Sequence, residues 1–323
     1  MRQITFASAA YLTKKKKTRR EKFLEEMDQA VPWGDLLRLT EKHYRKVSDS
    51  GRPKMPAERM LRVYFLQQWF NLSDPGAEEA LYDITSMRMF ARIELGQDLI
   101  PDETTILNFR RFLEEYELPQ KFFKRINKML EDKGLLMKSG TIVDATIIHA
   151  PSSTKNELKQ RDPEMKQTKK GNQWYFGMKA HIGTTKRGII HSLTTTSANV
   201  HDSVEFEKLL HGEEESVYAD SAYADSAYAN SQRKKEFENK GIKWRVSRKA
   251  PSGHPLSQKD KEWNRNQSRV RAFAEHPFHV FKCLWHHTKV RYRGIFKNTC
   301  QLFSLCALTN IFRLRHKLAA ASS

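Results

Sequence analysis

The apolar residues between positions 54 and 117 recur at helical spacing, as in PAERMLRVYFLQQWFNL. Breaks at SDPG and LGQDLIPDE divide this segment into three predicted helices, and Thr104 or Thr105 is expected to cap the third. A further helix is predicted over 118–138, with Gly134 as its C-cap. Three short helices with a basic surface are typical of a helix-turn-helix unit, and equally of a plain packing module.

After Gly140 the pattern changes to that of strands. TIVDATIIHA predicts a buried strand, and the polar, lysine-rich stretch 152–172 predicts a loop. YFGMKAHIGTT and GIIHSLTTTS alternate and are joined by TKRG, which predicts a hairpin. SVEFEKLL is then expected to be helical, with its cap at Asp202 or Ser203.

The remaining segments alternate between strand and helix patterns. ESVYAD and IKWRVSRK predict strands, and NSQRKKEFENKG and QKDKEWNRNQSRVRAFAEHPFHVFKCLW predict helices. The order β-β-β-α-β-α-β-α is that of the ribonuclease H-like fold, an α/β fold with a mixed sheet flanked by helices. We therefore expect a basic N-terminal arm over 1–50, an all-helical domain over 51–138 and a ribonuclease H-like domain over 139–316.

The charge of the chain favours a polyanionic partner. Lys and Arg number 57 against 38 Asp and Glu, a formal net charge of +19. The first twenty residues contain seven Lys or Arg and no acidic residue, which fits a solvated tail or an arm on a DNA backbone. Nucleic acid is the leading candidate, because phosphate neutralisation releases counterions, although a ribosomal protein would show the same charge.

Cysteine usage and hydropathy indicate the compartment. Cys283, Cys300 and Cys306 are odd in number and lack CxxC spacing, which argues against a disulfide framework or a zinc site. The N-terminus has no apolar core of signal-peptide length, and the longest uncharged stretch, 298–312, is too short and polar to cross a bilayer. We expect a soluble cytoplasmic protein.

Asp144 interrupts an otherwise apolar strand. An ionised carboxylate in such a strand is costly unless it is paired, binds a metal or lies at a solvated strand end. Asp220 ends the strand SVYAD, where ADSAY occurs twice in tandem, at 219–223 and 224–228. Asp220 is preferred as the residue facing Asp144, and Asp225 stays an alternative because the repeat can shift the register.

Glu275 lies on the last predicted helix. At about 100° per residue, Arg271, Glu275 and Lys282 share one face, and Val270, Phe273, Ala274, Phe281 and Leu284 form an apolar face. This arrangement is either an ion-pair ladder or a metal-binding carboxylate between two phosphate-binding cations. Pro277 is expected to kink the helix.

The region after Glu275 has no acidic residue and eight Lys or Arg. Lys289, Arg291, Arg293 and Lys297 surround Tyr292, a combination suited to contact with a DNA backbone and to base stacking. Trp174 beside Lys169 and Lys170 has the same character, and a partly buried tryptophan is its alternative. His149, His201 and Asp202 are weaker active-site candidates.

Several blocks of the sequence resemble a known family. The pattern R-x3-E-x6-K, formed by Arg271, Glu275 and Lys282, resembles the third-carboxylate signature of bacterial insertion-sequence transposases. IVDATIIHAP, YFGMKAHIG, TTSANVHDS, VYADSAY, AEHPFHVFK and VRYRGIFKN resemble consecutive blocks of the insertion sequence five family. The resemblance covers nearly all of 55–313.

The resemblance implies a ribonuclease H-like catalytic domain with an Asp-Asp-Glu triad, Asp144, Asp220 and Glu275. Two Mg²⁺ ions, for which Mn²⁺ can substitute, then bind these carboxylates, and the substrate is double-stranded DNA with terminal inverted repeats. A homodimer is expected, since two DNA ends must be brought together. Two features depart from the family: Ser268 stands where related families have Tyr, and the ADSAY block is doubled.

Two other functions fit the same residues. The first is a catalytically inactive, transposase-derived DNA-binding protein, which the doubled ADSAY block favours. The second is a nuclease of the same fold that cuts DNA without joining it.

Overall fold

The computed structural model describes residues 11, 13–44, 54–155, 157, 159–223, 227–250 and 254–320. Internal contacts divide the chain into a helical unit, Met1–Ile126 with Ile311–Ser323, and a sheet unit, Asn127–Asn310. The division falls inside helix α8 (Leu118–Asp132), whereas the sequence suggested a boundary at 138/139, after that helix. Candidate active-site residues all fall in the sheet unit.

The helical unit begins earlier than the sequence pattern suggested. It contains α2 (Arg19–Ala30), α3 (Trp33–Tyr44), α4 (Ala57–Phe70), α5 (Asp74–Asp83), α6 (Thr85–Phe90) and α7 (Glu103–Glu115). The expectation of a basic arm over 1–50 is therefore wrong for 19–44. Thr18 and Glu21 form a capping box at the start of α2, and Met27 and Leu36 are fully buried.

Two helix ends of this unit test the cap predictions. Asp102 caps α7, since its carboxylate accepts a hydrogen bond from Thr105 N at 2.6 Å. The prediction of Thr104 or Thr105 as the cap is thus wrong, because the helix begins two or three residues earlier than the apolar pattern indicates. Gly134 has φ +66° and follows the end of α8, which confirms it as the C-terminal stop.

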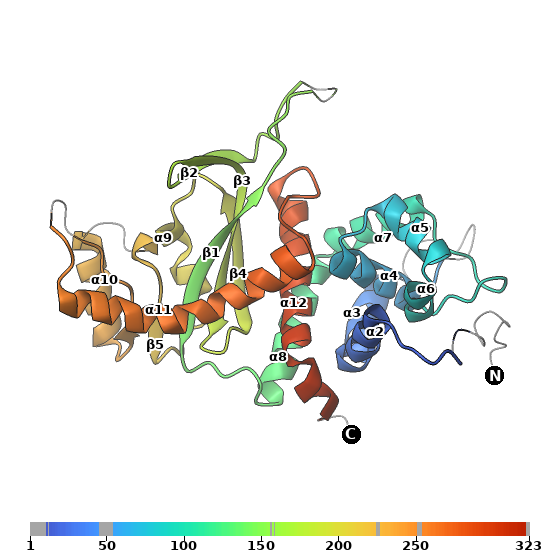
Figure 1. The fold of residues 1–323 in the computed structure, drawn as a ribbon, viewed down its shortest axis with the longest axis horizontal. Helices are drawn as coiled ribbons and strands as arrows, with labels where there is room; N and C mark the ends of the chain where they lie inside the picture. The colour runs from blue at the N-terminus through green and yellow to red at the C-terminus, as the bar shows by residue number, and fades with distance from the viewer. Residues whose placement is uncertain are drawn as a thin grey trace. The chain divides into compact units, whose positions relative to one another are not determined.

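The sheet unit contains one six-stranded mixed sheet (Figure 1). Its strands are β1 (Thr141–His149), β2 (Lys166–Lys170), β3 (Gln173–Thr185), β4 (Ile190–Ser197), β5 (Ser216–Tyr218) and β6 (Lys243–Trp244). The order is β2-β3-β1-β5-β6, and β4 pairs with β3. β3 is antiparallel to β1 and β4, whereas β1, β5 and β6 are parallel. The predicted ribonuclease H-like fold is confirmed by this order and these directions.

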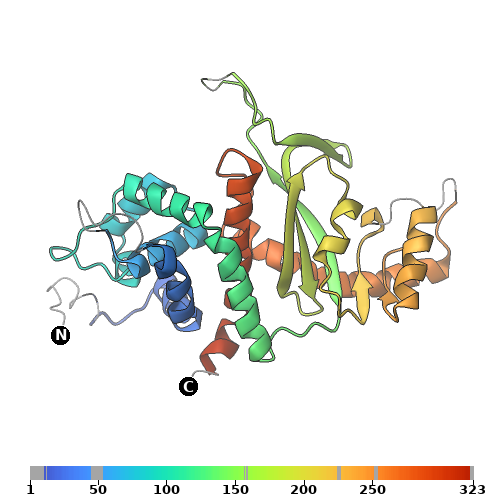
Figure 2. The ribbon, with the colours of Figure 1, turned by 180° about the vertical axis from the view of Figure 1, so that it is seen from behind.

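Helices fill the connections of the sheet unit. They are α9 (Asp202–Glu205), a 3₁₀ turn at Glu207–Leu209, a second at Ser221–Tyr223, α10 (Ala227–Asn239), α11 (Gln258–His279), a π-helical turn at Val280–Leu284 and the first part of α12 (Ile295–Ala320). α11 packs against β1 and β5 and crosses one face of the sheet. The helix lies in front of the sheet in Figure 1, and the sheet lies in front of the helix in the reverse view of Figure 2.

A compact aromatic core covers the opposite face. Phe206, Tyr223, Phe237 and Trp244 pack there with Val143. Because side chains alternate between faces along a strand, Val143 points into this core and Asp144 points to the other face. The strand pattern of the sequence thus places the carboxylate away from the core.

Three elements differ from the sequence prediction. β2 lies inside the segment 152–172, which was expected to be a loop. The sequence does not predict this strand, because its exposed residues KQTKK have no buried face. His201 caps α9, its ring accepting from Ser203 N, where Asp202 or Ser203 was predicted. α12 was missed, since much of it is buried on all sides and shows no polar face.

Candidate active site

Asp144 and Asp220 come together through strand register. β1 and β5 are neighbouring parallel strands in which Ile142 is level with Tyr218. Two residues further along each chain, Asp144 and Asp220 are therefore level with one another and on the same face. The amide of Ser247 donates to Ala219 O at 3.1 Å, so strand pairing continues up to the residue before Asp220.

α11 brings a cation and a third carboxylate to this face. Arg271 Nη1 lies 3.4 Å from Asp220 Oδ1. The charges of Arg271, Glu275 and Asp220 all act on Asp144. The structure thus makes the three predicted carboxylates neighbours, with Glu275 exposed on the helix and Asp144 half-buried on the strand.

The environment of Asp144 opposes its ionisation. Burial raises the pKa of Asp144 from 3.8 to about 6. A hydrogen bond from its own neighbour, Ala145 N at 2.9 Å, and the charge of Arg271 lower the pKa, whereas the charges of Glu275 and Asp220 raise it. One arginine thus leaves the negative charge of this cluster only partly balanced.

The three carboxylates are neighbours but do not form a closed cage. Among the described residues, no three His, Cys, Asp or Glu side chains gather closely enough to hold one metal ion. The donor set nevertheless fits a divalent cation of the magnesium type, since it consists of carboxylate oxygens and retains unrelieved repulsion around Asp144. Asp144 and Asp220 are the residues of this set fixed by the sheet.

Lys282 contacts β1, whereas the sequence predicted it on one helical face with Arg271 and Glu275. The helical face containing Arg271, Glu275 and Lys282 assumes one regular helix, but Pro277 lies within α11 and the π-helical turn Val280–Leu284 follows it. Lys282 Nζ donates to Thr146 Oγ1 and to Ile147 O, both at 2.9 Å. The predicted apolar face is also wrong for Phe273 and Leu284, which are 42% and 49% exposed. Leu284 lies in the π-helical turn, where the change of helical type shifts its phase.

The first copy of ADSAY supplies core residues. Ala219 is fully buried, and Tyr223 is 2% exposed in the core cluster. Asp220 lies between them, half-buried, and its Oδ1 accepts from Ser221 N at 2.7 Å. Asp225, the alternative second carboxylate, lies outside the described residues.

The basic segment after α11 is anchored to the end of β1. His149 N donates to Thr288 O, and Val290 N donates to His149 O at 2.7 Å. Burial, followed by the charges of Lys282 and Lys289, lowers the pKa of His149. The backbone of His149 thus pairs with the basic segment and fixes it to the end of β1.

A buried asparagine shapes the loop that carries the arginines. Asn298 Oδ1 accepts from the amides of Arg291 and Tyr292, and its Nδ2 donates to the carbonyls of Tyr292 and Gly294. Lys289, Arg293 and Lys297 are exposed on this segment, and Arg291 is half-buried. Sequence reasoning missed Asn298, because nothing in KNTC distinguishes this asparagine from a surface one.

Two acidic residues outside the predicted set cap the same loop. Asp162 accepts from Gly294 N at 2.6 Å, and Glu164 accepts from Ile295 N at 2.8 Å. These contacts join positions some 130 residues apart in sequence, so no local signal could have revealed them. Both carboxylates thus accept hydrogen bonds from backbone amides at the start of α12.

His201 and Asp202 do not join the carboxylate face. Asp202 Oδ1 pairs with Lys179 Nζ at 2.8 Å, and the buried ring of His181 lies 3.8 Å from the same oxygen. Ile182 of β3 is the partner of Asp144 and lies on the same face. Lys179 and His181 are three and one residues before it, so they point to the opposite face, on the core side of β3. His201 serves as the N-cap of α9.

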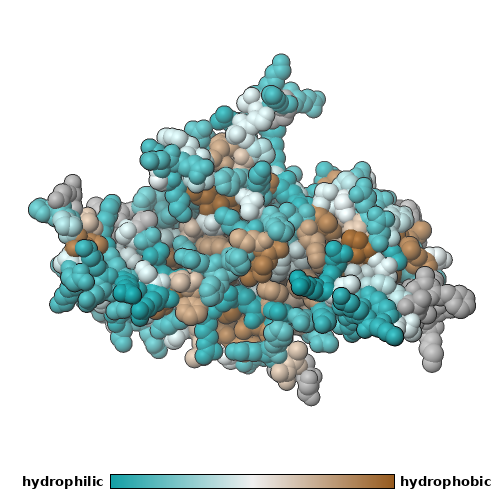
Figure 3. Space-filling view, viewed as in Figure 1, coloured by the Kyte–Doolittle hydropathy of each residue, from teal (hydrophilic) through white to brown (hydrophobic). Residues whose placement is uncertain are grey.

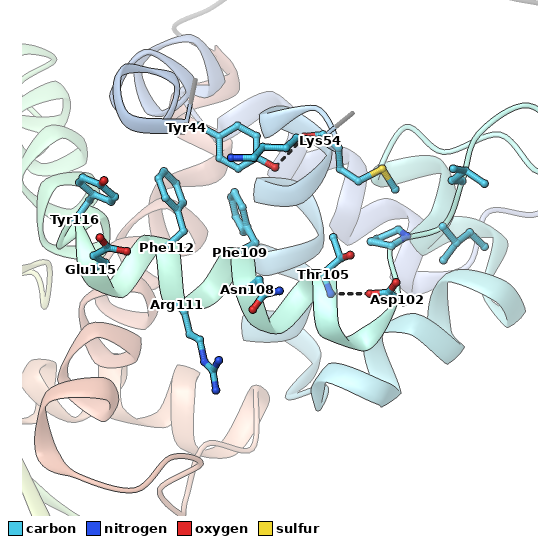
Figure 4. A pocket seen from close by; sticks show the side chains of 14 residues that line it. Tyr44, Lys54, Asp102, Thr105, Asn108, Phe109, Arg111, Phe112, Glu115 and Tyr116 are labelled. Carbon is cyan, nitrogen blue, oxygen red and sulfur yellow. Dashed lines mark hydrogen bonds between the residues drawn. The ribbon is translucent and has the colours of Figure 1, made fainter. Parts of the chain in front are cut away.

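A pocket of about 580 Å³ lies in the helical unit, between α7 and neighbouring residues (Figure 4). Phe109, Phe112, Tyr116 and Tyr44 give it aromatic walls, and Arg111 lies at its margin. None of the predicted catalytic residues lines this pocket.

Residues 12–112 match the family model described as Transposase domain (DUF772). A chain in the crystal structure of the Mos1 strand transfer complex is similar over 79% of this chain and 85% of its own, with 14% identity and a TM-score of 0.20. A match this weak adds nothing to the strand topology.

Other expectations concerned the cysteines and the membrane. All three cysteines are free. In the described part of the chain, no helix combines the length and the apolar character that a membrane span requires. Residues 136–311, more than half of the sequence, match the family model described as Transposase DDE domain, and the chain belongs to that family.

Proposed function

We propose that the protein is a DNA transposase of the insertion sequence five type. It cuts at the terminal inverted repeats of its element and joins the freed 3′-hydroxyl ends to target DNA. One observation carries this proposal: Asp144 and Asp220 are level on adjacent parallel strands, next to the helix bearing Arg271 and Glu275. Membership of the Transposase DDE domain family supports the same chemistry.

The three carboxylates are proposed to hold two Mg²⁺ ions, with Mn²⁺ as a substitute. When bound, such ions supply Lewis acidity and a nucleophile of lowered pKa for phosphodiester cleavage. Asp144, the sheet residue whose pKa both other carboxylates raise, would hold a metal ion together with them. Glu275 is exposed on α11, so DNA binding can bring its side chain to the other two.

The neighbouring cations have separate proposed tasks. Arg271, 3.4 Å from Asp220, balances that carboxylate and orients a phosphate beside it. Lys282 fixes the π-helical turn against β1 through Thr146 and Ile147. Lys289, Arg291, Arg293 and Lys297 form the proposed DNA surface, on a loop that Asn298 holds in shape.

A cleavage and strand-transfer assay tests the triad. We expect Asp144→Asn, Asp220→Asn and Glu275→Gln each to abolish nicking and joining of DNA that carries the element's ends, in Mg²⁺ or Mn²⁺. DNA affinity should change by less than about threefold, since the contacts with DNA are made mainly by cations. Glu238→Gln, an exposed substitution on α10, is the matched control. Full activity of any triad variant would remove that residue from the proposal.

The doubled ADSAY block favours one rival, an inactive DNA-binding protein. Deleting either copy gives the same single-copy chain, which keeps one Asp before the buried Tyr. If the wild type binds DNA without cutting it and the single-copy chain cuts, the doubling has inactivated this protein. If both the wild type and the single-copy chain cut DNA, two single variants of the wild type identify the second carboxylate. It is Asp220 if Asp220→Asn is inactive and Asp225→Asn is active, and it is Asp225 if the reverse holds.

The larger assembly is also part of the proposal. The helical domain recognises the terminal repeats, and a homodimer in the bacterial cytoplasm pairs two element ends at the nucleoid. A nuclease of the same fold would give cut ends without joined products in the same assay.

A further inference from the structure

The hairpin of β2 and β3 carries an exposed tryptophan. Trp174 is 65% exposed, and Lys169, its exposed cross-strand partner, lies directly opposite. Lys166 and Lys170 are exposed on the same hairpin, and no acidic residue occurs in the sequence between Glu164 and Asp202. A large aromatic ring left in water among lysines forgoes its burial energy, which is regained only when a partner covers it.

Strand alternation gives the direction in which Trp174 points. Ile182 pairs with Asp144, and Trp174 lies eight residues earlier on the same uninterrupted strand, an even spacing. Trp174 therefore belongs to the sheet face that carries Asp144. At a rise of about 3.3 Å per residue, the two are at most ~26 Å apart along the sheet, roughly the length of seven to eight base pairs.

Cationic groups connect this hairpin with the basic segment after α11. Phe176, the next residue of the same face, has the Arg161 guanidinium 5.4 Å from its ring centre. Arg161 also lines a hollow of about 200 Å³ together with Arg291, Tyr292 and Arg293. The charge of Lys170, on the same hairpin, is one of those that act on Lys282.

The chemistry of this surface fits nucleic acid. Cations spaced around exposed aromatic rings bind a phosphate backbone while a ring stacks on a base, whichever base it is. Hydrophilic and apolar residues are interspersed around the hairpin (Figures 1 and 3). The residues of β2 itself, KQTKK, are hydrophilic and mostly exposed. An acidic protein partner would match the lysines but would leave the flat aromatic face without a specific counterpart.

We infer that the β2–β3 hairpin is a second DNA contact, in which Trp174 stacks on a nucleobase and Lys169 and Lys170 bind the adjacent phosphates. This inference rests on the proposed function, since it assumes that DNA is the substrate. The recognised chemistry is a base face with its neighbouring phosphates. Its source is either a single strand or a base step opened in a duplex.

Binding of fluorescein-labelled oligonucleotides tests the inference with two probes, a single strand and a blunt duplex of mixed sequence. We expect Trp174→Ala to weaken binding about five- to a hundredfold, as the loss of one stacked base does, and Trp174→Phe to retain most of the affinity. Lys169→Ala with Lys170→Ala should reduce the slope of log affinity against log salt by about 1.4 on the single strand and about 1.8 on the duplex. The probe with the larger Trp174 effect identifies the source.

A matched control lies at the other end of β3. Lys186→Ala with Arg187→Ala removes the same charge from the β3–β4 turn and is expected to leave the Trp174-dependent affinity unchanged. If the wild type binds neither probe, DNA as the substrate is wrong. If the wild type binds and Trp174→Ala binds equally well, or the Lys186 and Arg187 variant weakens binding as much as the Lys169 and Lys170 variant does, the hairpin contact is wrong and the proposed function stands.

Discussion

At the residue scale, the proposed active-site carboxylate on β1, Asp144, works against the stability of its own unit. Asp144 is half-buried, and its charge is repelled by Asp220 and Glu275 and only partly balanced by Arg271. Polar groups of this kind are retained for what they bind, because a neutral side chain of the same shape costs less to bury. Asn differs from Asp here mainly in charge.

The raised pKa of Asp144 determines whether the stability of the protein rises or falls with pH. Because burial and neighbouring carboxylates raise the pKa from 3.8 to about 6, the folded protein binds more protons than the unfolded chain between these pH values. Stability therefore falls as the pH rises through this window, and the loss is complete above about pH 6. Without divalent metal, Asp144→Asn is expected to raise the free energy of unfolding at about pH 7.5 by ~1–2 kcal/mol, below the ~3 kcal/mol of the full shift because the carboxyl is partly solvated.

Urea unfolding in a chelator measures this change. The gain should shrink at about pH 5, where wild-type Asp144 is mostly protonated. Added Mg²⁺ should stabilise the wild type and not the variant. Glu238→Gln serves again as the exposed control, and a destabilised Asp144→Asn at neutral pH would contradict the account.

At the element scale, the end of α11 is positioned by two interruptions of the helix. Pro277 lacks the amide that would donate to Phe273 O, and the following turn is π-helical. Lys282 lies in this turn and donates to Thr146 Oγ1 and Ile147 O on β1. The turn and the strand beside Asp144 are thus joined by one half-buried ammonium group.

Removing that group should destabilise the sheet unit. We expect Lys282→Ala to lower the free energy of unfolding by about 1.5–3 kcal/mol, the usual range for hydrogen bonds to a charged group. Lys289→Ala, an exposed lysine of the next segment, should change it by less than about 0.5 kcal/mol. Chemical denaturation of both variants makes the comparison, and equal small effects would mean that Lys282 has no anchoring role.

At the scale of the whole molecule, 57 basic residues outnumber 38 acidic ones, and this net charge of +19 would govern the proposed encounter with DNA. The basic residues include the exposed sets on the β2–β3 hairpin and on the segment from Lys289 to Lys297. Binding that neutralises many phosphates releases as many counterions, so affinity depends steeply on salt.

We predict that raising monovalent salt from about 50 to about 200 mM weakens DNA binding by ~10³–10⁵, the effect of six to ten phosphate contacts. Anisotropy titrations at several salt concentrations give the slope for the wild type. Asp144→Asn should leave this slope unchanged, because it contributes no phosphate contact. A nearly salt-independent affinity would contradict binding through the backbone.

Local patterns were sufficient for several features. The apolar run around Asp144, the TKRG turn and the order of strands and helices indicated the ribonuclease H-like fold, since period and turn chemistry are local properties. The three carboxylates of the proposed site were predicted from their context in these elements and from the resemblance in R-x3-E-x6-K. β2 and α12 were missed, because an exposed strand and a helix buried on all sides lack the alternation that such patterns require.

Only the tertiary structure decided which residues meet. Register made Asp144 level with Asp220, the π-helical turn moved Lys282 onto β1, and Asn298 shaped the arginine loop. The sequence by itself determined the elements and their polarity, because these depend on near neighbours in the chain. Contacts such as that of Asp162 with Gly294 depend on how distant elements pack, and no local pattern contains that information.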